Sequence, residues 1–455
     1  MNSTLQSGPE RKTPLTWDQR ILQNAGRPRT SLKPECQELK FSLHRKLLDR
    51  INLEALATID NQRVRGEVRQ ALVSLMDGEP TLLSALDKQQ VIDEVLDEVF
   101  GLVPLEPLLE DPTISDILVN SHRQVYVERK GVLELTSVRF RDDQHLLRII
   151  DKIVSQVGRR IDESTPMVDA RLSDGSRVNA VIAPLAIDGP VLSVRRFSAD
   201  KLMPADLVER RAMMPAMMEL LEAAVRARLN IIISGGTGAG KTTLLNALSA
   251  FISPKERVIT IEDAAELQLK QPHVVRLETR PPNLEGHGAV RQRELLINSL
   301  RMRPDRIICG EVRGEEALDM LQAMNTGHEG SLTTVHANTP RDAVGRLEVM
   351  VTFAAANMPM ISIRQQIASA VHLLVQAARL SDGSRRVVSI TEVTGMEGDM
   401  LTLQDIFVFE KLGIAEDGRV LGRFTATGIR PKFCEKLMAA GIRLQAGMFD
   451  EMMEV

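Results

Sequence analysis

A glycine-rich stretch in the middle of the chain has residue types suited to binding phosphate. Gly235 and Gly240 bracket four residues, and Lys241 and Thr242 follow directly, which gives the pattern G-x-x-x-x-G-K-[ST]. Glycines let backbone N–H groups turn towards phosphate oxygens, and a helix N-terminus adds partial positive charge. Lys241 can reach the β- and γ-phosphates, while the Thr242 hydroxyl can ligate Mg²⁺. The sequence therefore predicts a nucleoside triphosphate bound by Gly235, Gly236, Thr237, Gly238, Ala239, Gly240, Lys241, Thr242 and Thr243.

Hydrolysis of a triphosphate also needs carboxylates, which hold Mg²⁺ and polarise the attacking water. Two apolar runs beyond the loop end in acids: residues 258–261 before Glu262 and Asp263, and residues 306–309 before Gly310 and Glu311. Two alternatives exist, because Glu262 and Asp263 could cap a helix and Glu311 could pair with Arg313. Beside a phosphate loop we favour the functional interpretation, with Glu262 and Glu311 as catalytic and metal-holding acids.

Two histidines follow in the segment 327–339. A lone histidine is more often structural, but His336 ends an apolar strand, where nucleotide sites collect. A neutral imidazole there could hydrogen-bond the γ-phosphate or relay its state to a neighbouring subunit. No Cys, His or Asp cluster accompanies His328 or His336, which disfavours a metal-ligand role for them.

The elements that must position these groups alternate between strand and helix over residues 208–455, which predicts a parallel sheet with crossover helices. We expect strands at 230–234, 258–261, 306–309 and 330–335, with helices after the loop, near 291–301, and at 315–324 and 341–351. A late hairpin is expected from 387–393 and 405–409, and a helix over 431–444 is expected to close the chain.

A mixed α/β domain is expected over residues 104–198. The predicted strands are 117–120, 125–128, 133–135, 168–172, 177–182 and 191–197, with a helix at 146–157 and a hairpin about Asp174 and Gly175. Four arginines lie on or beside these strands: Arg171, Arg177, Arg195 and Arg196. They could be exposed cross-strand partners or a basic face that meets phosphate, and the sequence leaves both open.

The N-terminal part divides into a tail and a helical unit. Residues 1–34 are predicted to be a flexible tail, in which Trp17 is the single apolar anchor. Residues 35–103 carry apolar positions at helical spacing, with a break at 78–80, and predict a small helical bundle. This unit could have solvated outer faces or dock a partner. Residues 199–207 are expected to link the second and third domains.

Composition argues against several classes of protein. The 455 residues carry a net charge of −4 and only 3% aromatic residues, which disfavours direct nucleic-acid binding. The three cysteines, Cys36, Cys309 and Cys434, lie far apart and suggest no disulfide framework, so a reducing cytosol is the simple expectation. No apolar run approaches about 18 residues, so neither a transmembrane segment nor a secretion signal is expected.

Four segments taken in order resemble the motif boxes of the type II/IV secretion ATPase superfamily. They are GGTGAGKTT at 235–243, ITIED at 259–263, CGEVRG at 309–314 and GHEGSLTTVHAN at 327–338. Residues 174–180, 282–286 and 425–431 are similar to the CpaF branch, which powers tight-adherence (Flp-type) pili. The resemblance covers roughly residues 35–445.

The resemblance implies a RecA-like P-loop NTPase core, preceded by a small mixed α/β (PAS-like) domain and an N-terminal helical bundle. It implies a cytoplasmic homohexamer that hydrolyses ATP with Mg²⁺ and acts on an inner-membrane platform protein. By position, Glu262 and Glu311 match the family's acids, and His328 and His336 match its histidine box. The arginines that reach the γ-phosphate would come from the α/β domain, with Arg177 and Arg195 as candidates, or from Arg276 and Arg280 across an interface.

Two other functions remain as alternatives. The first is a type IV secretion ATPase that drives DNA or effector export, against which the net charge of −4 argues mildly. The second is a nucleotide-gated scaffold without useful turnover, against which the intact Glu311 argues. The direction of work, the pilin, the platform partner and the order of firing among subunits are not encoded in any motif.

Overall fold

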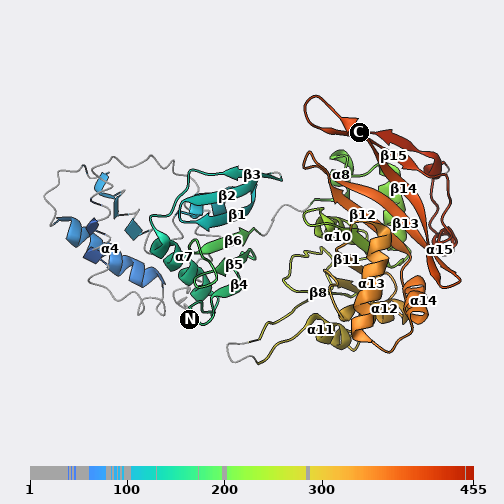
Figure 1. Cartoon of the computed structure of the whole chain (residues 1–455), viewed down its shortest axis with the longest axis horizontal. Coiled ribbons are helices and arrows are strands. Elements are labelled where there is room, and N and C mark those ends of the chain that lie inside the picture. Colours follow the sequence, from blue (N-terminus) through green and yellow to red (C-terminus); the bar gives the residue numbers. More distant parts are fainter. Residues whose placement is uncertain are drawn as a thin grey trace, which may run out of the picture. The chain divides into compact units, whose positions relative to one another are not determined.

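The computed structural model describes two compact units, Met1–Phe197 and Ser198–Val455 (Figure 1). The described residues are 39, 42–43, 46–47, 61–77, 84, 87–89, 91–92, 95–96, 104–129, 131–172, 174–196, 202–282, 287–445 and 447–455. The predicted tail, the break at 78–80 and the motif residues 283–286 lie outside them. Each unit is described by itself.

Helical packing begins the first unit. The helix α4 (Asn61–Asp77) buries Val68, Leu72, Leu75 and Met76 at the three-to-four spacing of one helix face. These residues pack in a single apolar cluster with Leu39, Leu43, Leu47, Val91, Ile92, Val95 and Leu96. The described residues therefore support helical packing in this part of the chain.

A six-stranded antiparallel sheet forms the second part of the first unit, in the order β3-β2-β1-β6-β5-β4. Its strands are β1 (Ile114–Ser121), β2 (Gln124–Arg129), β3 (Val132–Leu135), β4 (Met167–Arg171), β5 (Arg177–Val181) and β6 (Val191–Arg195). The helices α6 (Glu106–Glu110) and α7 (Asp143–Gln156) pack their apolar residues in one core with the strands. This is the mixed α/β arrangement expected from the sequence.

A ten-stranded sheet organises the second unit, in the order β16-β15-β14-β13-β12-β7-β11-β10-β8-β9. Six strands are parallel: β7 (Ile231–Gly235), β8 (Val258–Glu262), β9 (Val274–Glu278), β10 (Arg306–Cys309), β11 (Leu332–Val335) and β12 (Leu373–Arg379). Antiparallel strands extend it: β13 (Arg385–Glu397), β14 (Met400–Ile414), β15 (Val420–Ala426) and β16 (Met452–Glu454). The parallel part confirms the parallel sheet that the strand–helix alternation predicted.

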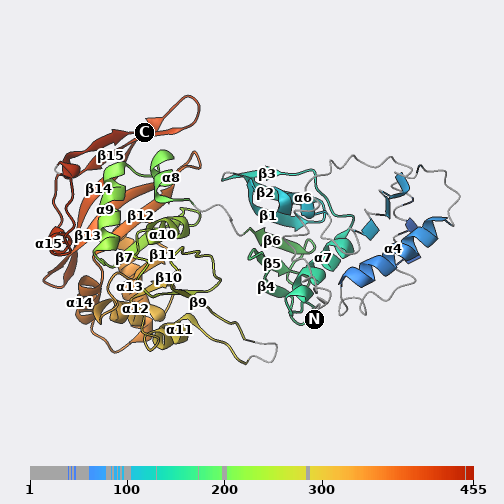
Figure 2. The same ribbon diagram turned by 180° about the vertical axis from the view of Figure 1, so that it is seen from behind.

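Helices cover both faces of this sheet (Figure 1 and Figure 2). Neighbouring residues of β7 show the division, because Ile231 and Ile233 join one apolar cluster while Ile232 joins the other. The first cluster includes α8 (Pro204–Glu209), α9 (Pro215–Arg226), α10 (Lys241–Ser249) and α15 (Cys434–Ala439). The second includes α11 (Gln292–Ser299), α12 (Glu316–Asn325), α13 (Pro340–Ala354) and α14 (Met360–Ala370). The parallel strands whose carboxyl ends carry the predicted site are thus packed against helices on both faces of the sheet.

The structure differs from several sequence-based expectations. The stretch predicted as a linker contains the start of α8, whose Leu207 is buried in the core of the second unit. The closing helix is only α15, Cys434–Ala439, and the chain ends instead with β16 at the sheet edge. β9, β12 and α14 were not predicted. β12 begins with a continuous apolar run that does not alternate, whereas α14 buries Ile363, Ile367 and Ala370 at helical spacing that the sequence analysis overlooked. Within the part of the chain that is described, no helix is both long and apolar enough for a membrane span.

Candidate active site

The phosphate-binding loop joins the end of β7 to the start of α10. Gly238 and Gly240 have φ of +71° and +90°, in the left-handed region that glycine adopts without strain. Gly235 is required for another reason, because a Cβ there would lie 2.5 Å from the backbone oxygen of Ala377 on β12. The glycines thus allow both the turn of the loop and its close approach to the neighbouring strand.

Lys241 begins α10 and folds back over the loop. Its side chain is buried, and Nζ donates to the backbone oxygens of Gly235 at 3.0 Å and Gly236 at 3.2 Å. Nζ also lies 3.2 Å from Nε2 of His336, which follows β11. The structure therefore brings together the predicted lysine and one of the predicted histidines, although 95 residues separate them.

Glu311 lies beside this pair, just beyond the end of β10. Its Oε1 is 3.3 Å from Nε2 of His336, and its Oε2 accepts a hydrogen bond of 2.8 Å from Arg313. The alternative role considered for Glu311, an ion pair with Arg313, therefore does occur. It occupies one carboxylate oxygen only, because Oε1 is buried and has no hydrogen-bond partner among the described residues.

The protonation of His336 explains why Glu311 Oε1 is left unpartnered. Burial lowers the pKa of His336; Glu311 opposes this shift, and Lys241 and nearby arginines add to it. The imidazole is therefore neutral near pH 7, and its Nε2 accepts from the Lys241 ammonium. A nitrogen that accepts has no proton to donate, so it gives none to Glu311. One buried carboxylate oxygen thus stays available as a proton acceptor.

Glu262 ends β8 and is buried. Its Oε2 accepts from the backbone N–H groups of Glu266 at 2.7 Å and Leu267 at 2.9 Å, while Oε1 is buried without a partner among the described residues. Burial raises the pKa of Glu262, and the two backbone donors oppose that shift. No helix follows Glu262 in the described part of this segment, so the helix-cap alternative is wrong.

Gly310 separates strand β10 from Glu311, and the structure gives its reason. A Cβ at this position would lie 2.8 Å from Cγ of Glu262. Cγ is not the free end of that side chain, because Oε2 is anchored by two backbone donors. Only glycine therefore allows the two acidic segments to lie this close together.

We expect Gly310→Ala to destabilise the chain by about 1–3 kcal/mol, because it overpacks a filled interior. Urea unfolding of the nucleotide-free protein measures this change. Gly345→Ala is the matched control, since a Cβ there meets nothing within 4 Å inside α13. The control should be neutral or stabilising by about 0.5–1 kcal/mol. Equal stability of the two variants would contradict the packing argument.

Not all predicted residues meet at this site. His328 precedes β11 by four residues, whereas the loop and His336 lie at the opposite, carboxyl end of the parallel strands. Its Nδ1 is buried without a partner among the described residues, and its backbone oxygen accepts from Ser331. The structure therefore separates His328 from Lys241 and His336 within one chain.

The arginines of the first unit form a row across its sheet. Arg171 is the register partner of Arg177, and Arg177 is the register partner of Arg195. Arg196 has a structural role, because its guanidinium donates to the backbone oxygens of Asp111 and Ile114. Arg177 and Arg195 thus share a basic row, and Arg196 does not belong to the candidate set.

One arginine at the loop was missed by the sequence analysis. Arg385, at the start of β13, donates from Nε to the backbone oxygen of Gly238 at 2.9 Å. The two residues are 147 positions apart, and no motif includes Arg385, so only the fold could reveal the contact.

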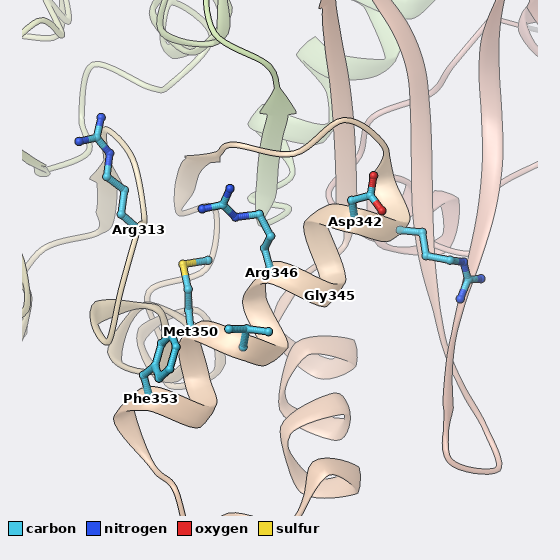
Figure 3. Close-up of a pocket in the computed structure, with 8 residues that line it drawn as sticks. Arg313, Asp342, Gly345, Arg346, Met350 and Phe353 are labelled. Atoms are coloured by element: carbon cyan, nitrogen blue, oxygen red, sulfur yellow. The ribbon is translucent and has the colours of Figure 1, made fainter.

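A pocket of about 530 Å³ lies next to Glu311, between α13 and the segment after β10 (Figure 3). Arg313 is shared between this pocket and the Glu311 carboxylate. Figure 3 shows Arg313 and Arg346 extending to the same side, above Met350 and Phe353. Arginine side chains in the lining therefore place positive charge near the Glu311 carboxylate.

The chain matches the family described as type II/IV secretion system protein over residues 98–406. It is 40% identical over 307 residues to a putative conjugal transfer protein of Mycobacterium tuberculosis, covering 66% of this chain and 87% of the relative. It is 34% identical over 294 residues to conjugal transfer protein TrbB of Rhizobium radiobacter, covering 64% of this chain and 86% of that relative. The VirB11 ATPase of Brucella suis superposes with a TM-score of 0.35 at 29% identity, covering 65% and 97% of the two chains.

Proposed function

The chain belongs to the type II/IV secretion system protein family and is a P-loop ATPase. We propose that it works as a homohexamer and that this hexamer drives the assembly of Flp-type pili. One observation carries the catalytic part of this proposal. The buried Oε1 of Glu311 has no hydrogen-bond partner among the described residues and lies 3.3 Å from Nε2 of His336, which in turn contacts Lys241 of the phosphate-binding loop. A proton acceptor placed there can activate a water against a bound γ-phosphate.

The proposed steps use groups already in place. ATP draws Lys241 away from the loop's own carbonyls to the β- and γ-phosphates, and the neutral His336 stays within reach of the same phosphates. Glu311 accepts the proton of the attacking water through Oε1. Of the three residues predicted to hold Mg²⁺, Glu262 presents a buried carboxylate oxygen without a partner among the described residues, which fits an oxygen-ligated cation together with the Thr242 hydroxyl. Glu311 Oε1 is taken by the attacking water in this scheme, so the metal role predicted for Glu311 is not used. Bound Mg²⁺ would supply positive charge against the phosphate oxygens.

The ring assignment rests on an arginine that reaches the γ-phosphate from another domain or copy. In the described part of the second unit, Arg385 contacts the loop backbone, and Arg313 is held by acids, pairing with Glu311 at 2.8 Å and lying 3.6 Å from Asp263. Charge that builds on the γ-phosphate during transfer needs a further cation. We assign this role to Arg177 or Arg195 of the basic row, supplied by a moving domain or a neighbouring copy.

The pilus assignment is supported by the similarity of residues 174–180 and 425–431 to the CpaF branch. In this proposal the hexamer lies on the cytoplasmic side of the inner membrane. Hydrolysis there moves its domains against a membrane platform protein, which inserts or extracts pilin subunits. Restoration of surface pili in a deletion strain by the wild-type chain, but not by an inactive variant, tests this role directly.

The composite site predicts that the ATPase rate per chain rises as copies associate. We expect the steady-state rate to climb with protein concentration in parallel with the mass of the assembly measured by light scattering. Arg195→Ala should lower the rate of the assembled form by at least about tenfold without lowering its mass. A concentration-independent rate from a monomer would mean that each chain holds a complete site, and the homohexamer would have to be abandoned.

A second candidate is an ATPase of a type IV secretion system for DNA or effector export, which the names of the conjugal transfer relatives favour. Loss of conjugation rather than of pili in the deletion strain would select it. Salt-dependent DNA binding at physiological ionic strength would add support. A nucleotide-gated scaffold remains the candidate of another class, and turnover at background level in the assembled protein would select that role.

A further inference from the structure

Two arginines from the two arms of one hairpin lie against the phosphate-binding loop. Arg379 ends β12, Arg385 begins β13, and the two are register partners. A Cβ added to Gly238 would lie 3.3 Å from Nη1 of Arg379, and one added to Gly240 would lie 3.2 Å from Cδ of Arg385. The hairpin therefore packs on the two left-handed glycines that give the loop its shape.

The hydrogen bond from Arg385 fixes one peptide plane of the loop. The Gly238–Ala239 peptide is trans, so its N–H points away from its carbonyl oxygen. Because Arg385 Nε holds the Gly238 oxygen at 2.9 Å on the outside, the Ala239 N–H must face the inside. The Ala239 N–H does face the inside, where it donates across the loop to the backbone oxygen of Gly236 at the long distance of 3.3 Å. A phosphate oxygen can readily replace so weak an acceptor.

The turn of the hairpin is itself anchored from outside. Asp382 accepts hydrogen bonds from the backbone N–H and the hydroxyl of Ser384 through Oδ1. Its Oδ2 accepts from the backbone N–H of Val420, at the start of β15, at 2.8 Å. The antiparallel extension of the sheet thus holds the turn in place over the loop.

The residues that follow Arg385 bind the segment that enters the second unit. Arg386 donates to the backbone oxygen of Arg210 at 3.2 Å, and the N–H of Val387 donates to the oxygen of Ala212 at 2.8 Å. Arg210 is the C-terminal cap of α8, and α8 lies at the start of this unit. Three consecutive residues therefore contact the phosphate loop and the entering segment.

We propose that Arg385 is a positioning residue that orients the Ala239 N–H towards phosphate. The start of β13 links this orientation to Arg210 and Ala212 in the segment that enters the second unit. The link lets a displacement of the entering segment change the loop's affinity for nucleotide. This inference rests on nucleotide binding at the loop and needs neither the hexamer nor the pilus role.

The test is the steady-state kinetics of the full chain with Arg385→Ala. We expect KM for ATP to rise about tenfold while kcat stays within about twofold, because Glu311 and Lys241 are untouched. Arg419→Ala is the matched control; Arg419 pairs with Asp417 beside a turn and is 75% exposed. The control should leave KM unchanged, and both variants should melt at similar temperatures without nucleotide. An unchanged KM, or a fall in kcat alone, would overturn the proposal.

A milder variant keeps the test decisive if Arg385→Ala does not fold. Asp382→Ala removes the anchor of the turn but retains Arg385, and we expect KM to rise about threefold. An unchanged KM in this variant would refute the positioning role. Lack of turnover and nucleotide binding by the wild-type chain would instead refute the ATPase assignment itself.

The link to the entering segment is tested by a double-mutant cycle. If Arg385 and Arg386 act through one connection, the combined alanine variant should raise KM by less than the product of the two single effects. A combined effect equal to the product of the two single effects would mean that the entering segment and the loop are independent, which would overturn the link.

Discussion

Replacing Glu311 by glutamine should lower kcat at least about a hundredfold while leaving the Kd for ATP within about threefold of wild type. Glutamine keeps the shape of the side chain and an oxygen for Arg313, but its amide cannot take a proton from water. The buried Oε1, which no described residue contacts by a hydrogen bond, is the atom whose function is lost. Steady-state hydrolysis and equilibrium binding of a fluorescent ATP analogue separate the two quantities.

Asp263→Asn is the matched control for this substitution. Asp263 lies in the same acidic region, with Oδ2 3.6 Å from Arg313, but its side chain is 47% exposed. We expect the control to retain turnover within about threefold, since an exposed charge contributes little. A Glu311→Gln variant that keeps more than about a tenth of wild-type turnover would exclude Glu311 as the general base. Glu262 would then be the next candidate.

Residues that follow different strands could be predicted from the sequence to form one site, because the carboxyl ends of parallel strands lie on the same side of the sheet. Lys241, His336 and Glu311 follow β7, β11 and β10, and the structure brings them within hydrogen-bond or ion-pair distance. Local motifs sufficed here because His336 and Glu311 lie just beyond short buried strands and Lys241 ends the loop that follows β7. His328 belongs to the same motif but precedes its strand, so the structure does not bring it to Lys241 and His336 within one chain.

Contacts between distant segments could not be predicted. The need for glycine at position 310 comes from the nearby Glu262 side chain, and this contact exists only after β8 and β10 pair. Arg385 reaches the loop because the β12–β13 hairpin is placed next to β7. Neither fact leaves a local periodicity or spacing in the sequence. Such residues must be found from the packing of the folded chain.

The same packing explains the extent of the second unit. α8 begins within residues 199–207, which were expected from the sequence to form a linker. Its single buried residue, Leu207, joins a large apolar cluster, and its C-terminal residue Arg210 is bonded by Arg386. One buried side chain in six residues is too short a signal to show a helical apolar face, so only the core that receives it identifies the element.

Replacing Lys241 by methionine should weaken ATP binding by about a hundredfold or more. Removing one partner of a buried charge pair costs about 2–5 kcal/mol, and about 2.7 kcal/mol corresponds to a hundredfold in affinity. The net loss is smaller than the lysine–phosphate attraction, because ATP must first displace the bonds from Nζ to the Gly235 and Gly236 oxygens. Methionine also lacks the two hydrogen bonds from Nζ to the loop carbonyls, so the nucleotide-free variant should be less stable than the nucleotide-free wild type.

Lys255→Met provides the control, since Lys255 is exposed just beyond α10 and lies outside the loop. Isothermal titration with ATP should give a Kd near wild type for Lys255→Met and no measurable binding for Lys241→Met at moderate concentrations. Thermal melting without nucleotide should separate them in the same order. Binding by Lys241→Met within about tenfold of wild type would mean that the backbone N–H groups of the loop hold the phosphates without the lysine. In that case the fold-back of Nζ onto the loop carbonyls would be its main role, and the ammonium would stabilise the empty loop rather than the bound nucleotide.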